Sequence, residues 1–265
     1  MRKILSRTRA AVDDYKMIQN GDKIAVGVSG GKDSVMLLKV LCDLKRFYPA
    51  DFEIVAITLD MRFNNQDGDF TSIQKMCDEY GIEYVIQKTD LYEIIFNIRK
   101  ESNPCSLCAR MRRGILHDTA KELGCNKIAL GHHFDDVIET VLLSIFYGGE
   151  YKSMPPKLHS TNFLGMELIR PLYLIREKDI ISWVKYNDLK FINCACSVTE
   201  KNNEFDSKRL EMKLLIKSLE EKNGLIASNI FKSTENVNID TLLAIKTNGN
   251  KISFLENYDN NNIDE

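Results

Sequence analysis

A hexapeptide near the start of the chain combines the residue types that bind phosphate. It consists of Ser29, Gly30, Gly31, Lys32, Asp33 and Ser34. Its two glycines let the backbone approach an anion closely, its lysine adds a full positive charge, and its serines offer hydroxyl donors. Its aspartate is suited to capping a helix or to holding Mg²⁺. The spacing Gly-x4-Gly-Lys-Ser/Thr is absent, which excludes a Walker A loop.

Two groups of cysteines form the second chemical feature. Cys105 and Cys108 follow an asparagine suited to an N-cap and a proline suited to the first helical position. At about 100° per residue, Cys105, Cys108 and Arg112 share one helix face, and the helix dipole favours thiolates there. Cys194 and Cys196 lie far downstream. Four thiolates suit zinc and three suit an iron–sulfur cluster with one iron open, so the spacing allows both.

The overall composition is that of an ordinary globular protein. Of 265 residues, 44% are hydrophobic and 28% are charged. Seven cysteines is an odd number, and clustered cysteines in a reducing compartment indicate metal binding or catalysis rather than disulfides. Cys42, Cys77 and Cys125 stand alone in apolar or helical surroundings, which predicts plain core or surface thiols.

The sequence predicts a cytoplasmic protein with no membrane partner. No apolar run reaches the roughly 18–20 residues that span a bilayer, and the N-terminus lacks the apolar region of a secretory signal. The net charge of −2 hides uneven charge. Arg7 and Arg9 belong to one basic cluster, and Arg110 and Arg113 belong to another. Such clusters attract phosphates through their local field, although solvated helix faces are the alternative interpretation.

Apolar segments alternate with helical patterns along the first half of the chain. Runs at 23–28, 52–59, 82–86 and 127–130 predict strands, and intervening patterns, including 34–44, 105–123 and 136–147, predict helices. This alternation predicts an α/β fold with a doubly wound parallel sheet. We expect one domain over 1–220 and a C-terminal extension over 221–265 with a partly disordered tail beyond about 250.

Less regular patterns follow in the second half. We expect the first twenty residues to form a helix, 168–172 to form an edge strand because Pro171 disfavours a central one, and helices near 176–187 and 204–222.

Ligands of an open parallel sheet gather beyond the carboxyl ends of its strands. Asp60 ends the second predicted strand, and Gly131 and Asp136 follow the fourth. Gly131 would let the backbone approach a nucleotide, and Asp136 would hold Mg²⁺ or orient the reacting group. The alternative for Asp136 is a helix cap without chemistry.

The hexapeptide matches the SGGxDS signature of the PP-loop ATP pyrophosphatases, the adenine nucleotide α-hydrolases, and lies in the expected strand–turn–helix context. The segment from Gly131 to Asp136 resembles the GHxxDD segment of that family. The resemblance implies a Rossmann-like fold and an ATP site in which the loop holds the β and γ phosphates. A substrate oxygen would attack the α-phosphorus and release pyrophosphate.

Over about residues 1–220, several segments together resemble the TtcA family, which forms 2-thiocytidine at position 32 of tRNA. These segments lie at 104–116, 127–136, 146–149, 154–158, 169–172 and 176–179. The resemblance implies a [4Fe-4S] cluster on Cys105, Cys108 and Cys194. It also implies ATP with Mg²⁺, tRNA as the substrate and a cysteine desulfurase as the sulfur donor. The oligomeric state is open, with a homodimer as one option.

The resemblance also assigns roles to individual side chains. Lys32 would stabilise phosphate charge, Asp136 would orient Mg²⁺ or assist proton transfer, and Arg112 would stabilise charge at the base or at the incoming sulfur. The basic clusters would hold tRNA phosphates.

The downstream cysteines depart from the family pattern Pro-Cys-x-x-Cys, because here Asn193 precedes Cys194 and Cys196 follows it at two residues. Cys196 is therefore the alternative third ligand. Three other hypotheses remain: a 2-thiouridine-forming enzyme of the same superfamily, a zinc site, and an ATP-binding iron–sulfur sensor without turnover. Lysidine-type chemistry has no use for clustered cysteines.

Overall fold

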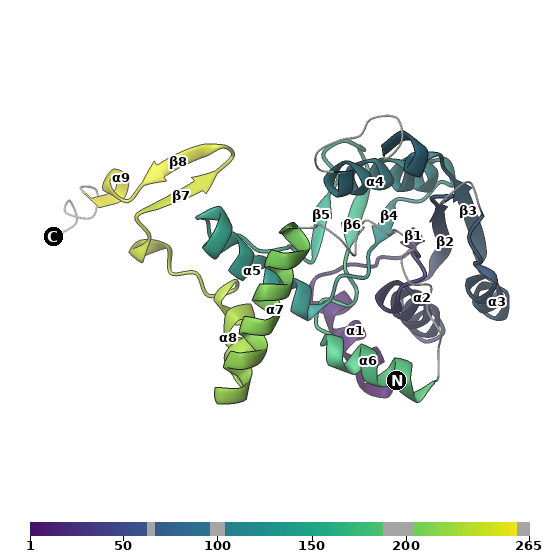
Figure 1. Ribbon diagram of the computed structural model, residues 1–265, viewed down its shortest axis with the longest axis horizontal. Helices are drawn as coiled ribbons and strands as arrows, with labels where there is room; N and C mark the ends of the chain where they lie inside the picture. Colours follow the sequence, from purple (N-terminus) through teal and green to yellow (C-terminus); the bar gives the residue numbers. More distant parts are fainter. Residues whose placement is uncertain (63–66, 96–103, 188–203, 259–265) are drawn as a thin grey trace.

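A six-stranded sheet forms the centre of the computed structural model, which describes residues 1–62, 67–95, 104–187 and 204–258 (Figure 1). Its strands are β1 (Asp22–Gly27), β2 (Phe52–Asp60), β3 (Glu83–Lys88), β4 (Lys127–Ala129), β5 (Lys157–His159) and β6 (Glu167–Ile169). The spatial order is β3-β2-β1-β4-β6-β5. All neighbours pair in parallel except β5, which is antiparallel to β6. The chain changes direction across the sheet between β1 and β4, so the doubly wound prediction is confirmed.

Helices cover both faces of this sheet. They are α1 (Arg2–Asp14), α2 (Lys32–Lys45), α3 (Thr71–Tyr80), α4 (Pro104–Glu122), α5 (Phe134–Gly148) and α6 (Glu177–Tyr186). Along β1, Ile24 and Val26 enter the larger core with α1, α2, α3, α5 and α6. Ala25 points to the opposite face, into a smaller core that includes Ala120 of α4. This alternation follows from the two-residue period of a strand, and it places α1 and α4 on opposite faces.

The expectation of an edge strand at 168–172 is wrong. β6 lies between β4 and β5, and β5 is the edge. Pro171 does not interrupt the ladder because β6 ends at Ile169. The backbone N–H of Arg170 then donates to the carbonyl of Pro156 at 3.0 Å. The proline therefore ends the strand without forcing it to the edge.

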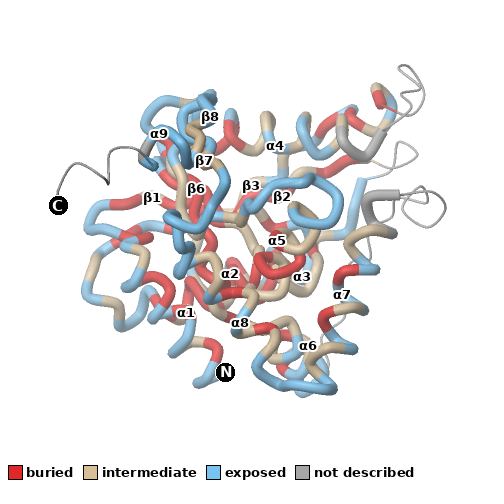
Figure 2. Tube along the Cα trace, turned by 90° about the vertical axis from the view of Figure 1, so that its left-hand side faces the viewer, coloured by how far each residue is buried: buried red, intermediate tan, exposed pale blue. Residues whose placement is uncertain are grey.

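The chain after the sheet forms α7 (Glu204–Lys222) and α8 (Ile226–Ser233). Ala227 and Phe231 of α8 are buried in the larger core, so that core continues past residue 220. A 3₁₀ turn (Ile239–Thr241), a hairpin of β7 (Ala244–Thr247) and β8 (Asn250–Ser253), and α9 (Leu255–Tyr258) follow, exposed over much of their length (Figure 2).

The hairpin corrects the expectation of disorder beyond about 250, at least as far as residue 258. Asn248 and Gly249 join its strands with φ of 50° and 82°. Two positive φ values in a two-residue Asn-Gly loop indicate the type I′ turn that suits the twist of a hairpin. Among the described helices none is both long and apolar enough to cross a membrane.

Candidate functional site

The phosphate loop is held in a closed shape by its own serines. The hydroxyl of Ser34 donates to the carbonyl of Gly31 at 2.9 Å and accepts from the backbone N–H of Ser29 at 3.1 Å. Gly30 has a φ of 83°, which favours glycine. α2 begins at Lys32 without a side-chain cap. Its first N–H groups and the positive end of its dipole are therefore directed at the place where an anion would bind.

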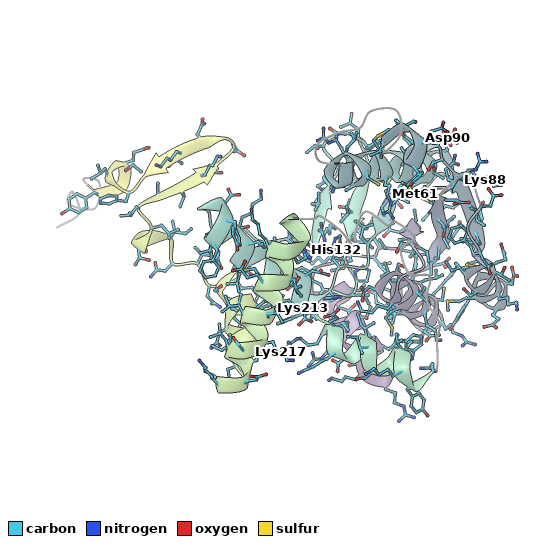
Figure 3. All side chains as sticks on the ribbon, in the orientation of Figure 1. Met61, Lys88, Asp90, His132, Lys213 and Lys217 are labelled. Carbon is cyan, nitrogen blue, oxygen red and sulfur yellow. The ribbon has the colours of Figure 1, made fainter. Side chains whose placement is uncertain are left out.

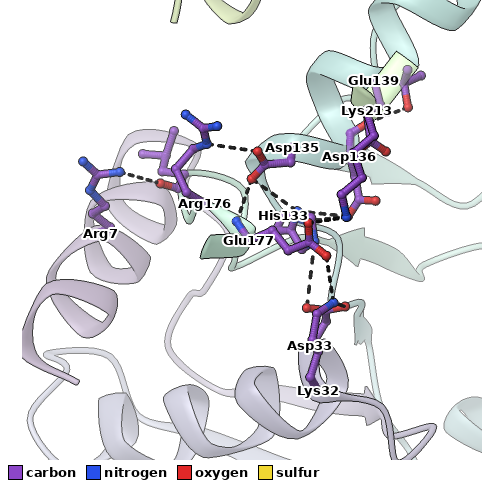
Figure 4. A network of polar contacts seen from close by, with 12 residues as sticks. Arg7, Lys32, Asp33, His133, Asp135, Asp136, Glu139, Arg176, Glu177 and Lys213 are labelled. Carbon is purple, nitrogen blue, oxygen red and sulfur yellow. Dashed lines mark hydrogen bonds and ion pairs between the residues drawn. The ribbon is translucent and has the colours of Figure 1, made fainter. Parts of the chain in front are cut away.

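Lys32 is shared between two carboxylates. Its ammonium lies 2.9 Å from Oδ2 of Asp33 and 3.1 Å from Oε1 of Glu177, the first residue of α6 (Figure 4). Burial lowers the pKa of Lys32, but these two carboxylates outweigh burial and raise its pKa overall. The lysine is therefore charged at neutral pH, and a phosphate would compete with Glu177 for it.

Gly131 brings β4 against the phosphate loop. A Cβ at this position would lie 3.1 Å from the carbonyl carbon and oxygen of Asp33 and 3.2 Å from the backbone nitrogen of Ser34. These contacts are with backbone, which cannot rotate away as a side chain can. Glycine is therefore required by the close approach of the end of β4 to the phosphate loop, whereas the approach to a nucleotide stays a prediction.

The two aspartates that follow have different partners. Oδ2 of Asp136 accepts from the backbone N–H of His133 at 2.9 Å, and its Oδ1 accepts from Arg209 of α7 at 2.8 Å. Asp136 thus caps α5 and also faces the site. Asp135 accepts from Arg176 at 3.0 Å and from the backbone N–H of Glu177 at 2.6 Å, so it caps α6 rather than α5.

A cavity of about 460 Å³ opens beside the loop. The loop contributes Ser29, Asp33 and Ser34, and one face of α4 contributes Ala109, Arg112, Arg113, Leu116 and His117. Gly131, His132 and Asp136 complete the polar part of its wall. The structure therefore brings together the predicted loop, Gly131, Asp136 and Arg112. It does so at the carboxyl ends of β1 and β4, where ligands bind in open sheets.

The histidines at this cavity are neutral at neutral pH. Burial, reinforced by Arg170 and Arg209, lowers the pKa of His132 to about 4. Burial and then Arg113 lower the pKa of His117. Arg112 and Arg113 thus line a cavity whose imidazoles are uncharged, which suits an anionic ligand.

Orphaned polar atoms also mark this region. Within the described residues, Oδ1 of Asp33 and Nδ1 of both His117 and His132 are buried without a hydrogen-bond partner. Carboxylate oxygens are the ligands that Mg²⁺ prefers, so Asp33 fits a metal ion that accompanies a triphosphate.

The predicted cluster ligands are only partly described. Cys105 and Cys108 lie in the first turns of α4, and Cys108 is half-buried. The side chain of Cys105, and all of Cys194 and Cys196, lie outside the described residues. Ala109 and Arg112 follow Cys108 on the same helix and line the cavity, so α4 fits a thiolate-bound group next to the loop.

The solitary cysteines behave as predicted. Cys42, Cys77 and Cys125 are buried, and burial raises the pKa of the first to about 12 and of the other two to about 11. They are inert thiols of the core.

Four other predicted residues, Asp60, Arg7, Arg9 and Arg110, lie outside the cavity lining, whereas Arg113 belongs to it. Asp60 is buried, and its carboxylate accepts from the backbone N–H groups of Arg62 and Gly68 at 3.0 and 3.1 Å, so it orders the chain after β2. Arg7 donates to the carbonyl of Leu174, and Arg9 pairs with Asp13 on α1. Arg110 and Arg113 are exposed on α4, across the sheet from α1. The two basic clusters therefore lie on opposite faces.

Sequence reasoning missed Arg209, Glu177 and Lys213. Glu177 lies in the segment 176–179, which was noted only as part of a resemblance. Arg209 and Lys213 are charged residues of a helix with no local signal, and their partners lie 73 and 36 positions away.

Comparison with known proteins gives consistent matches. The PP-loop domain family matches residues 3–215. A tRNA-cytidine(32) 2-sulfurtransferase of Geotalea uraniireducens is 40% identical over 236 residues, covering 89% of this chain and 91% of its own length. Another from Aliivibrio fischeri is 45% identical over 203 residues, which cover 76% of this chain and 65% of that relative.

A solved structure agrees in fold. The U34-tRNA thiolase NcsA from Methanococcus maripaludis, with its [4Fe-4S] cluster, superposes with a TM-score of 0.67. It is 25% identical, and the match covers 88% of this chain and 77% of that one.

Proposed function

The chain belongs to the PP-loop family and, within it, to the tRNA-cytidine(32) 2-sulfurtransferases. From that membership we propose that it uses ATP to replace the C2 oxygen of cytidine 32 in tRNA with sulfur. One observation supports the proposal beyond ATP binding: α4, which carries Cys108 in its second turn, contributes Arg112 to the cavity that the phosphate loop lines. A thiolate-bound group on α4 would therefore lie about one helical turn from the cavity wall.

The first half-reaction is activation of the base. The C2 oxygen attacks the α-phosphorus of ATP, a bond to pyrophosphate breaks, and AMP becomes joined to the base. The amides at the start of α2 and the ammonium of Lys32 stabilise the departing pyrophosphate charge. Mg²⁺ that accompanies ATP fits the orphaned Oδ1 of Asp33 and the carboxylate of Asp136.

The second half-reaction is replacement of AMP by sulfur. A [4Fe-4S] cluster on Cys105, Cys108 and Cys194, with Cys196 as the alternative third ligand, would supply the sulfur at the iron without a cysteine. Arg112 stabilises the negative charge that develops when C2 is attacked and AMP leaves. A cysteine desulfurase would supply new sulfur to the site after each turnover. For the assembly we propose a homodimer.

The target base must leave its stack to enter the cavity, which an anticodon-loop position allows. Arg110 and Arg113, exposed next to the cavity, would contact phosphates of the loop that presents it. Arg7 and Arg9 lie on the opposite face of the sheet, so their contact would be with a more distant part of the tRNA. Asp60, by ordering the chain after β2, would shape the nucleotide site without touching the phosphates.

The decisive experiment combines metal analysis with product analysis. The full chain is purified without oxygen, its iron, sulfide and zinc are measured, and it is incubated with ATP, Mg²⁺, a sulfide source and tRNA that carries C32. We expect iron and sulfide, and 2-thiocytidine by mass spectrometry of the nucleosides, with none from tRNA in which C32 is replaced. Zinc without iron would exclude this sulfur-transfer route.

The alternatives give different products. A 2-thiouridine enzyme would thiolate a uridine of the tRNA instead, and the M. maripaludis neighbour is a thiolase of U34. A sensor without turnover would hold the cluster and bind ATP but release no pyrophosphate with any tRNA.

A further inference from the structure

Three polar side chains of α7 reach residues around the phosphate loop. They are Arg209, Lys213 and Glu220. At about 100° per residue, positions 213 and 220 differ in direction from position 209 by about 40° and 20°. All three therefore lie on one face of α7, and this face meets the start of α5 and the start of α6.

Arg209 controls the carboxylate that faces the cavity. Its Nη1 lies 2.8 Å from Oδ1 of Asp136 and 3.4 Å from Oε2 of Glu139, one helical turn further along α5. The other oxygen of Asp136 is held by the backbone of His133. Arg209 therefore fixes the rotation of Asp136 and compensates its negative charge. Without this arginine, Oδ1 of Asp136 would lose the cation that holds it.

Lys213 acts on the phosphate loop through Glu177. Lys213 projects from α7 (Figure 3). Oε2 of Glu177 lies 2.5 Å from the ammonium of Lys213, and its Oε1 lies 3.1 Å from that of Lys32 (Figure 4). Burial raises the pKa of Glu177, but Lys213 and Lys32 outweigh it and lower its pKa overall. A carboxylate shared between two lysines holds each less tightly than a carboxylate with one. Lys213 thus makes it easier for a phosphate to draw Lys32 away.

Glu220 anchors the same region from the end of α7. It accepts two hydrogen bonds from Arg176, both at 2.9 Å, and Arg176 also donates to Asp135 at 3.0 Å. Asp135 in turn caps the backbone N–H of Glu177. The first turn of α6 is therefore fixed to α5 and α7 together.

We propose that α7 is a positioning element of the ATP site. Arg209 orients Asp136, and Lys213 weakens the ion pair between Glu177 and Lys32. Arg209 and Lys213 are positioning residues, because each acts through a residue nearer the phosphates. The reaction that they serve rests on the proposed function, but the affinity for an ATP analogue can be measured without tRNA or sulfur.

The role of Lys213 is tested by nucleotide affinity. α,β-Methylene-ATP with Mg²⁺ is titrated by calorimetry into the full chain without tRNA. We expect Lys213→Met to weaken binding about 3- to 10-fold, because Glu177 then pairs with Lys32 without competition from Lys213. The affinity cost of an altered close charge pair is of this order. Lys213→Met with Glu177→Gln should restore the affinity. The matched control is Lys217→Met, which removes an exposed charge of the same helix.

The role of Arg209 is tested by turnover. Arg209→Met should leave the affinity for the analogue within about twofold and lower the maximal rate of pyrophosphate release with tRNA by about 10- to 100-fold, as for loss of other groups that orient a reacting ligand. The KM for tRNA should not change. Arg209→Lys, which keeps the charge beside Asp136, should recover part of the rate.

The outcomes separate positioning from structural support. Wild-type affinity in Lys213→Met and a wild-type rate in Arg209→Met would overturn the proposal. Losses of affinity or rate that merely follow a fall in melting temperature would also overturn it. So would losses that neither the double variant nor Arg209→Lys recovers. If Arg209→Met does not fold, the proposal is still tested by Arg209→Lys and by Lys213→Met with and without Glu177→Gln. Failure of the wild-type chain to thiolate tRNA would refute the proposed function, while the affinity measurements would still decide the role of α7.

Discussion

Replacing Gly131 with alanine tests how closely the two strand ends must approach. The new Cβ would lie 3.1 Å from the carbonyl carbon and oxygen of Asp33 and 3.2 Å from the backbone nitrogen of Ser34. Ordinary contact begins near 3.4 Å, so the backbone of the phosphate loop must move by at least 0.3 Å, the difference between 3.4 and 3.1. The hydroxyl of Ser34 closes that loop through Gly31, which resists the movement.

The magnitude follows from the cost of overpacking. Inserting a methyl group into closely packed structure costs about 1–3 kcal/mol. If the displaced amides no longer match the phosphates, that cost appears in affinity, where about 1.4 kcal/mol is a factor of ten. We therefore expect Gly131→Ala to bind α,β-methylene-ATP about 5- to 150-fold more weakly by calorimetry, and to have a lower melting temperature.

A matched glycine provides the control. Gly114 lies in α4, and a Cβ there would meet nothing within 4 Å. Gly114→Ala should stabilise the protein by about 0.4–1 kcal/mol, because alanine loses less entropy in a helix, and it should leave ATP affinity unchanged. Equal affinity in Gly131→Ala and the wild-type chain would refute the view that this glycine sets the shape of the loop.

Three further predictions concern the cysteines, a buried acid and a buried ion pair. Cys194→Ala should lose most of the iron and sulfide of the anaerobically purified chain and Cys196→Ala should keep both; the reverse result would make Cys196 the third ligand. Burial raises the pKa of Glu139 from about 4.5 to about 7, so the folded state retains a proton that the unfolded state loses between these values, and stability falls as pH rises through this window. Glu139→Gln should therefore raise stability at pH 8 by up to about 3 kcal/mol and leave melting near pH 4 unchanged; a variant no more stable at pH 8 would contradict the raised pKa. Burial raises the pKa of Asp22, but hydrogen bonds from Lys127 and Asn126 outweigh it and lower its pKa overall. The ionised Asp22 carboxylate therefore stabilises the folded state above about pH 3.9, and this contribution is lost as pH falls further. Asp22→Asn should cost about 3 kcal/mol in urea unfolding at pH 7, because among the described residues it leaves the buried Lys127 with Glu167 as its one carboxylate partner. A cost that persists at pH 2 would refute the electrostatic origin.

The fold was predictable where the signal is local. Strand 23–28 shows a continuous apolar run because both of its faces are covered, and the observed β1 spans Asp22–Gly27. The place of β6 in the sheet was not predictable, since it depends on where β5 pairs. The hairpin of β7 and β8 was missed although Asn248-Gly249 is a strong turn signal, because the polar tail around it was taken for disorder.

The candidate site was predictable only in part, for a similar reason. The phosphate loop and the segment from Gly131 to Asp136 are contiguous motifs at strand ends, and topology alone brings them together. Arg209 is different: on α7 it is one charged residue among many, a pattern that usually indicates a solvated face. Its function is visible only when α7 packs against α5. Such partners are set by tertiary packing, which no local pattern encodes.

In the proposed function, the position of α4 would let activation and sulfur transfer share one cavity. The adenylated base is a reactive intermediate, and water that reached it would return the starting nucleoside. Cys108 lies one helical turn, about 6 Å along the axis, from Arg112, which lines the cavity. A sulfur source held by the first turns of α4 is therefore close enough for C2 to be attacked where it was activated. On this argument the base does not move between the two steps: pyrophosphate departs in the first and AMP in the second, while C2 stays in place.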